Sequence, residues 1–304
     1  MLNKNNDSHK EYSGRLRYER WFLVTLRYGS FMGSMSITDQ RTSPATRRIW
    51  SSTDAILLLA AGAAAEIAGS KAVEWMFVMR RMPDAPLERM VESVRFARRV
   101  FCSDCFSARA AIAKTNDVHR RVEDHRGERI PEWAYRDMLY MFVDYGIRAH
   151  EVVYGPISRP GQRSYCDDVM ALGHAMDIKN LPQSYEDYER ERSRHLQENY
   201  RRSARTSQLN QSYRDALGSA RYAAWRPVQV WLMPEELRST LAVEHHRNRV
   251  VEGLLRKYRY MPGGGRKLGP LYGFLLPGWF AAALIQLSED QGTSGPTSCI
   301  SKAG

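Results

Sequence analysis

His119 is the histidine whose surroundings best suit a ligand to a metal or cofactor. The chain has eight histidines, and most of the others lie in polar stretches. His119 falls near the end of a predicted helix over residues 104–123, whose apolar members would turn its ring toward the core. A neutral imidazole is a common metal ligand, but an inward histidine is also often a hydrogen-bonded core residue. Both interpretations stay open at this point.

Arg89 and Ser93 stand four residues apart in the preceding predicted helix, so they share one face. A buried arginine requires an anion, and a cofactor carboxylate would provide one, with the serine hydroxyl as a neighbouring donor. The alternative is that Arg89 pairs with a nearby carboxylate of the protein at the surface.

Glu66 lies in the middle of a long apolar segment that is rich in alanine and leucine. An isolated ionised carboxylate is costly to bury. Glu66 is therefore expected to be paired with an arginine, protonated, or functional.

Cysteines and sequence motifs give little sign of other chemistry. Cys102 and Cys105 have the spacing of a zinc or redox pair, but no second ligand pair follows at a suitable distance. We expect two buried thiols at helix ends, because no secretory signal opens the chain and disulfides are rare in reducing compartments. Glycine-rich nucleotide loops, a nucleophile elbow and a zinc-protease helix are all missing from the sequence.

The hydrophobic pattern predicts an all-α chain, because no segment alternates with the period of a strand. A loop is expected over 33–50, and Ser158 and Ser184 are expected to begin helices. The predicted helices cover residues 15–32, a core helix from about 53, 87–101, 104–123, 132–154, 160–175, the charged run 185–205, two helices within 222–260, and a final apolar segment over 268–287.

The composition is that of a globular protein: 304 residues, 43% hydrophobic and 26% charged. Mean hydropathy is −0.52, which excludes a polytopic membrane protein. The net charge of +11 raises the question of nucleic acid. Because the arginines are interleaved with acidic residues, we interpret them as solvated helix faces and expect no nucleic-acid partner.

Several motifs follow one another in order along the chain. The small-residue helix reads LLLAAGAAAEIAG from Leu57, and it is followed by DAPLERMVES and VRFARRVF. Val118-His119, the turn Gly155-Pro156-Ile157-Ser158 and the stretch LGHAMDIKNLPQSYEDYERERSRHL come next. Together these motifs resemble the MpaB and rubber-oxygenase family, in which a helix ends in a Val-His motif and a Pro-Leu-Ser-like turn follows, and the similarity covers about residues 50–285.

The resemblance implies a single globin-reminiscent domain of about ten helices around one haem b. His119 matches the proximal iron ligand, Arg89 the arginine near the haem, and Ser93 the family's usual threonine. Glu92 stands where rubber oxygenases carry a lysine that can fill the distal iron site, which places their polymer-cleaving mechanism in doubt here. In these terms residues 1–50 are a partly disordered arm, 51–288 the haem-binding oxygenase-like domain and 289–304 a flexible tail.

The resemblance also suggests that the helix over 132–154 lines the distal pocket. Asp144 and Tyr145 are then candidates for proton delivery, together with Glu66. The expected function is haem-dependent oxidation of an apolar small molecule with O2 or peroxide and an unknown electron donor, in specialised-metabolite biosynthesis. The alternative is a non-catalytic haem-binding or membrane-surface protein. We expect an intracellular location, cytoplasmic or peripherally membrane-associated. Residues 268–287 are expected to form either a C-terminal helix packed on the core or a contact with a membrane surface.

Overall fold

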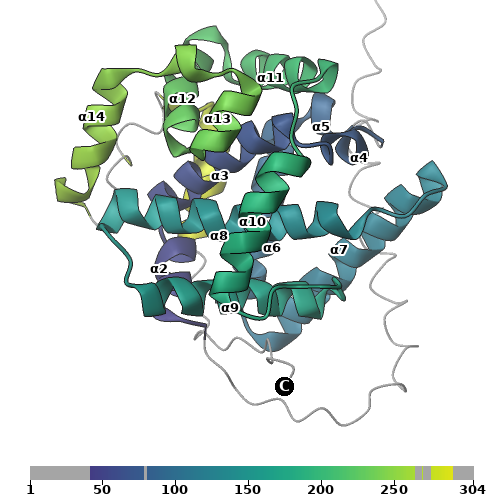
Figure 1. The fold of residues 1–304 in the computed structure, drawn as a ribbon. Helices are drawn as coiled ribbons and strands as arrows, with labels where there is room; N and C mark the ends of the chain where they lie inside the picture. Colours follow the sequence, from purple (N-terminus) through teal and green to yellow (C-terminus); the bar gives the residue numbers. More distant parts are fainter. Residues whose placement is uncertain (1–41, 79–80, 264–268, 270–274, 290–304) are drawn as a thin grey trace, which may run out of the picture. The chain divides into compact units, whose positions relative to one another are not determined.

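A buried apolar helix, α3 (Thr53–Gly69), runs through the centre of the fold. Alanine and leucine favour helix, and the Ser52 hydroxyl caps the first turn by accepting a hydrogen bond from the Ala55 amide. Every residue of α3 except Leu57 is buried, because α8 (Glu132–Tyr154), α11 (Ala204–Leu217) and α12 (Ser219–Leu232) pack against it (Figure 1). The predicted core helix is confirmed.

The computed structural model describes residues 42–78, 81–263, 269 and 275–289. They belong to a compact unit that starts at Thr38. All regular elements within these ranges are helices, and the one isolated β-bridge there pairs Ser70 with Tyr200. The all-α prediction is therefore confirmed. The helix predicted over 15–32 lies outside the described residues, as does nearly all of the predicted tail.

Residues 44–51 form helix α2 (Pro44–Ser51), where the sequence predicted a loop. The Ser43 side chain accepts a hydrogen bond from the Thr46 amide, and Pro44 suits the first turn. Burial of Ile49 and Trp50 then stabilises the helix against the core. In the described part of the chain no single helix is long and apolar enough to cross a membrane, and α2 and α3 meet that criterion only as a pair bent by 86°.

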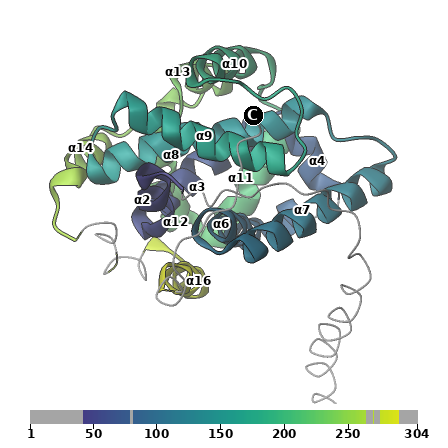
Figure 2. The ribbon, with the colours of Figure 1, turned by 90° about the horizontal axis from the view of Figure 1, so that it is seen from below.

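Helices α6 (Pro86–Cys102) and α7 (Cys105–Arg126) pack side by side (Figure 2). Asp104 caps α7 through the Ser107 amide, and Gly127, with φ of 74°, ends it. The helix predicted over 104–123 is confirmed, and it continues to Arg126, about two turns beyond His119. Cys102 and Cys105 are only half-buried and Cys105 takes part in a disulfide bond, so the expectation of two buried thiols is wrong.

The second half of the chain largely follows the predicted pattern. Ser158 begins α9 (Arg159–Ala175) and Ser184 begins α10 (Tyr185–Glu198), each by accepting a hydrogen bond from an amide three residues on. The region 222–260 holds more helices than the two predicted, because Pro234 and Asn248 start new ones. They are α12, α13 (Glu235–Leu241), η1 (Glu244–His246), α14 (Arg249–Lys257) and η2 (Tyr258–Tyr260).

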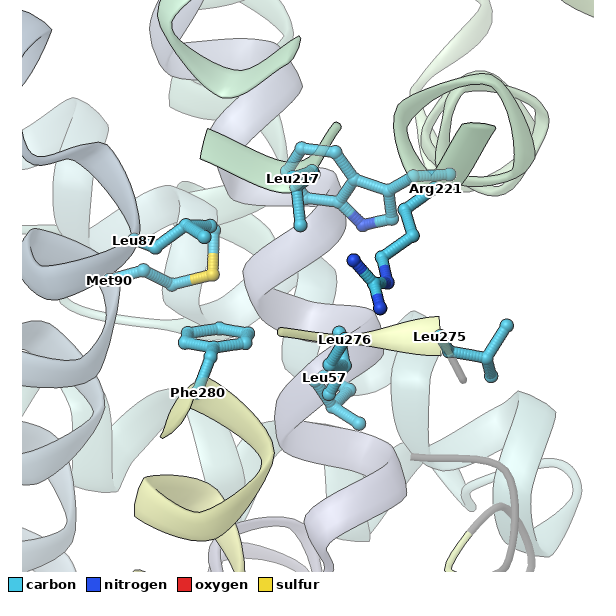
Figure 3. Close-up of a pocket in the computed structure, with 9 residues that line it drawn as sticks. Leu57, Leu87, Met90, Leu217, Arg221, Leu275, Leu276 and Phe280 are labelled. Atoms are coloured by element: carbon cyan, nitrogen blue, oxygen red, sulfur yellow. The ribbon is translucent and has the colours of Figure 1, made fainter. Parts of the chain in front are cut away.

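The C-terminal apolar segment contributes helix α16 (Gly278–Glu289), which packs on α3 and α6. Figure 3 shows Phe280 of α16 beside Met90 and Leu87 of α6, with Leu57 of α3 nearby. The cavity between them has a volume of about 30 Å³. It has room for no more than a few water molecules. Two short helices, α4 (Val73–Phe77) and α5 (Arg81–Asp84), complete the fold.

Candidate functional site

Glu66, the charged residue predicted inside the apolar helix, is fully buried and paired. Its Oε1 accepts hydrogen bonds from Arg192 Nη1 at 2.6 Å and from the Tyr200 hydroxyl at 2.5 Å. Its Oε2 accepts from Arg192 Nη2 at 2.6 Å and from the Tyr145 hydroxyl at 2.8 Å. A carboxylate has about four lone-pair positions, so these donors occupy all of them. Of the three outcomes left open by the sequence, this is pairing with an arginine.

The elements around Glu66 are held together by the backbone as well. The end of α3 is joined to the segment after α10 by hydrogen bonds of 2.9 Å from Arg201 N to Gly69 O and from Lys71 N to Asn199 O. This pairing fixes Tyr200 next to the last turn of α3. Arg192 reaches the same carboxylate from the buried face of α10.

Tyr145 approaches α3 closely because residue 62 is a glycine. A Cβ atom at Gly62 would lie 2.2 Å from the Tyr145 ring, a distance that no side chain tolerates. Burial, and secondly the Glu66 charge, raise the pKa of Tyr145 well above its ordinary value. The hydroxyl is therefore a neutral donor to Glu66 at any physiological pH.

Asp144 is the acidic neighbour of this group. It accepts hydrogen bonds from Arg148 at 2.6 Å and Arg192 at 3.0 Å. Burial acts to raise the pKa of Asp144, but the two guanidinium groups outweigh it and the pKa is lowered. The structure thus brings the three predicted catalytic residues, Glu66, Asp144 and Tyr145, into one ionic network. Their catalytic role stays a prediction.

A second buried polar group, between α8 and α10, was not singled out by the sequence. Asp137 of α8 is fully buried and forms a hydrogen bond with His195 Nδ1 of α10. Asn199 donates to the same carboxylate at 3.0 Å. Burial raises the pKa of Asp137, although His195 and Asn199 oppose the shift.

His119 lies apart from this network, on α7. The side chain is half-buried, and its ring lies 5.1 Å from that of Tyr135 on α8. Burial and the nearby Arg89 charge lower the pKa of His119, while Glu123 partly opposes them. Among the described residues neither imidazole nitrogen has a hydrogen-bond partner. Because the side chain is half-buried and neither nitrogen is among the buried atoms that lack a partner, water can reach the ring, and His119 is a neutral imidazole at the edge of the core.

Glu123 organises the far end of this region. Its carboxylate accepts hydrogen bonds from Arg129 and the Ile130 amide, both at 2.9 Å, and from the Tyr135 hydroxyl at 3.4 Å. These contacts fix the turn between α7 and α8. They also hold the Tyr135 ring against His119.

The Arg89 charge acts on His119 from α6, the helix that packs against α7. The Arg89 guanidinium forms a 2.7 Å ion pair with Glu92, in which both side chains are about 40% exposed. This is the surface pairing that the sequence left open. Ser93 is exposed and donates to the Arg89 carbonyl oxygen at 2.9 Å, and the role of its hydroxyl toward a cofactor stays a prediction.

The two groups of predicted residues therefore occupy different places: Arg89 and His119 on α6 and α7, and Glu66, Asp144 and Tyr145 between α3, α8 and α10. Residues 47–261 match the family model described as the catalytic domain of the ER-bound oxygenase mpaB/B′ and rubber oxygenase. The match covers more than half of the chain. No curated protein matches the sequence.

Proposed function

The chain belongs to the mpaB and rubber-oxygenase family and carries its oxygenase catalytic domain, and on this basis we propose that it is a haem-b-dependent oxygenase with His119 as the iron ligand. The observation that carries the proposal is the half-buried His119 imidazole, whose pKa is lowered by burial and by the charge of Arg89 on the neighbouring helix α6. The proposal extends the family assignment to a cofactor and to particular residues.

The set of available ligands favours haem over an iron ion held by the protein alone. A non-haem oxygenase site uses two histidines and a carboxylate. No cluster of three histidine, cysteine, aspartate or glutamate side chains able to hold a metal occurs within the described ranges. Haem iron receives four nitrogen ligands from the macrocycle and needs one side chain from the protein, which His119 supplies.

The surroundings of His119 suit that role. An imidazole binds iron only when neutral, and burial together with Arg89 lowers the pKa of His119 in the direction that keeps it neutral. Tyr135, held by Glu123, packs against the ring and restricts its rotation. Residues that orient a ligating histidine commonly tune its affinity for the metal.

Arg89 is available to a haem propionate because its present ion pair is weak. The Arg89 and Glu92 side chains are 38% and 41% exposed, and exposed pairs contribute about 0–1 kcal/mol. A propionate would therefore replace Glu92 at little cost. Arg89 lies on α6 and His119 lies on α7, and these two helices pack against each other.

Half-buried apolar side chains support an apolar substrate. Tyr135, Met138 and Phe142 follow one another at intervals of three and four residues, so they share a face of α8. That face begins at the contact with His119. Bound haem would supply the oxygen activation, and these side chains would bind the substrate and exclude water. Specialised-metabolite biosynthesis is the role that we propose for such an oxidation.

The test is the visible spectrum and pyridine haemochrome of the protein expressed with a haem precursor. We expect a Soret band with near-stoichiometric haem b, which His119→Ala should abolish. His174→Ala is the matched control, since His174 is an exposed helical histidine on α9. Full Soret absorbance in His119→Ala would refute the ligand assignment. Colourless protein that also fails to take up added haemin would refute the cofactor.

A further inference from the structure

A pocket of about 320 Å³ lies beside α12, away from both groups of predicted residues. It is bounded by the end of α11, the first half of α12 and η1, and both neighbours pack against α12. Figure 1 shows α12 between α11 and α14. The pocket is lined by Arg214, Ser219, Tyr222, Ala223, Arg226, Pro227 and His246.

Arg226 is the unusual residue of this pocket, because it is buried without an acidic partner. It is 7% exposed. Its one hydrogen bond to a described residue goes from Nη1 to the neutral Gln229 Oε1 at 2.9 Å, and its guanidinium lies 5.9 Å from the Tyr222 ring. No carboxylate among the described residues pairs with it. Burial, and secondly Arg214, lower the pKa of Arg226, so the protein leaves this charge uncompensated.

Gln229 holds Arg226 in place. Gln229 is 1% exposed, and its Nε2 donates to the Ala61 carbonyl of α3 at 3.2 Å. Its amide is thereby oriented with the oxygen toward Arg226. The arginine is fixed at the pocket wall by a buried contact to the central helix.

The other groups in the pocket add positive charge. Arg214 lies over the same Tyr222 ring, at 5.3 Å. Burial, then Arg226, His245 and Arg214, lower the pKa of His246 to about 4. The charged groups that act on Arg226 and His246 are thus arginines and a histidine, together with the Tyr222 hydroxyl. Because positive charge dominates this site, it favours the binding of an anion.

The N-terminus of α12 also favours an anion in this pocket. Helix α12 begins at Ser219, which lines the pocket, and its first turn has no side-chain cap. The free amides and the dipole of a helix N-terminus favour negative charge. The uncapped end and the buried arginine are independent features that point to the same kind of ligand.

We propose that this pocket binds the phosphate group of a small organic phosphate. Guanidinium groups bind phosphate through paired hydrogen bonds, and Arg226 and Arg214 together offer two such groups. The volume of about 320 Å³ falls at the lower end of the range of about 300–1,000 Å³ for small-molecule pockets. The inference is independent of the haem, because it uses none of the same residues.

Thermal shift and calorimetry with pyrophosphate at constant ionic strength test the proposal. We expect saturable binding that stabilises the protein and weakens roughly tenfold or more in Arg226→Gln, which loses charged hydrogen bonds. Arg214→Gln should weaken it less, since that arginine is exposed. Arg109→Gln, at an exposed position of α7, is the matched control and should bind as the original chain does.

Vesicles distinguish the source of the phosphate. Co-sedimentation with phosphatidylcholine vesicles that contain phosphatidic acid, lost in Arg226→Gln, would assign the phosphate to a lipid headgroup. Binding of pyrophosphate alone would assign it to a soluble molecule. Absence of saturable binding to either probe, or binding that Arg226→Gln and Arg214→Gln leave unchanged, would overturn the proposal.

The stability of the ligand-free variants separates binding from a structural role. Removing a buried charge that has no acidic partner should leave the melting temperature of Arg226→Gln unchanged or raise it. A marked loss of stability in Arg226→Gln, with Arg214→Gln binding pyrophosphate normally, would assign Arg226 to the structure and contradict the proposal.

Discussion

Replacing Glu66 by glutamine removes the central charge of the buried network and leaves the shape of the side chain nearly unchanged. Among the described residues, Arg192 would keep Asp144, at 3.0 Å, as its one acidic partner. The hydroxyls of Tyr145 and Tyr200 would lose a charged acceptor. The structure therefore predicts a large loss of stability from the change of a single atom.

The magnitude follows from burial. Breaking a fully buried ion pair costs about 3–5 kcal/mol, because an uncompensated charge remains. Since Asp144 still compensates part of the Arg192 charge, we expect a loss near the lower limit, about 3 kcal/mol. At about 2–4 °C per kcal/mol for a domain of this size, the melting temperature should fall by roughly 6–12 °C.

The assay is calorimetric melting of four proteins: the original chain, Glu66→Gln, Arg192→Met and the double variant. In the double variant Asp144 keeps Arg148 at 2.6 Å, so its loss of stability should be smaller than the sum of the single losses. Glu189→Gln is the surface control, because Glu189 forms the same two-point ion pair with Arg159 at 43% exposure. We expect that control to cost less than about 1 kcal/mol. A Glu66→Gln protein that melts at the same temperature as the Glu189→Gln control but has lost turnover would refute the structural interpretation. Glu66 would then be assigned as a catalytic acid or base.

Three further perturbations have a defined sign. Gly62→Ala should cost about 1–3 kcal/mol of stability, because its Cβ would lie 2.2 Å from Tyr145. Gly253→Ala, where the added Cβ would have nothing within 4 Å, should gain about 0.5–1 kcal/mol from helix propensity. Equal melting temperatures of the two variants would contradict the close approach of α3 and α8. The pKa of His119 is lowered from 6.5 in the folded protein. Between that lower value and pH 6.5 the unfolded chain binds more protons, so the free energy of unfolding must rise with pH. In denaturant titrations His119→Asn should reduce the slope of the free energy of unfolding against pH, and an unchanged slope would exclude the shift. Glu92→Lys introduces the residue type that rubber oxygenases carry at the matching position. In haem-loaded protein this variant should give the absorption spectrum of low-spin, six-coordinate haem. An unaltered spectrum would show that residue 92 does not reach the iron.

The helices could be predicted because their signals are local. Alanine and leucine in α3, and the capping serines Ser158 and Ser184, determine helix formation within a few residues of their own position. Helix α2 was missed because its polar surroundings hid a capping serine and two buried apolar residues. A serine- and threonine-rich segment favours a loop. One capping serine and two apolar residues do not outweigh that preference when the core against which the apolar residues pack is unknown.

The partners of Glu66 could not be predicted in the same way, since the pair with Arg192 spans 126 positions of the chain. A usable signal was nonetheless present in α10. Its buried residues Tyr185, Tyr188, Arg192, His195 and Leu196 recur with helical spacing on one face. Arg192 and His195 therefore stand on the apolar stripe of a charged helix, which separates them from the solvated arginines beside them.

The placement of Glu66 also affects how the chain folds during synthesis. Helix α3 is apolar all round, and the helices that cover it, α8, α11 and α12, all follow it in sequence. At about 5–20 residues per second, the 126 positions between Glu66 and Arg192 take roughly 6–25 s to translate. Throughout that interval α3 lacks α11, α12 and the cation that neutralises Glu66, and α8 is complete only after residue 154. We therefore expect fragments that end before α10 to aggregate rather than fold.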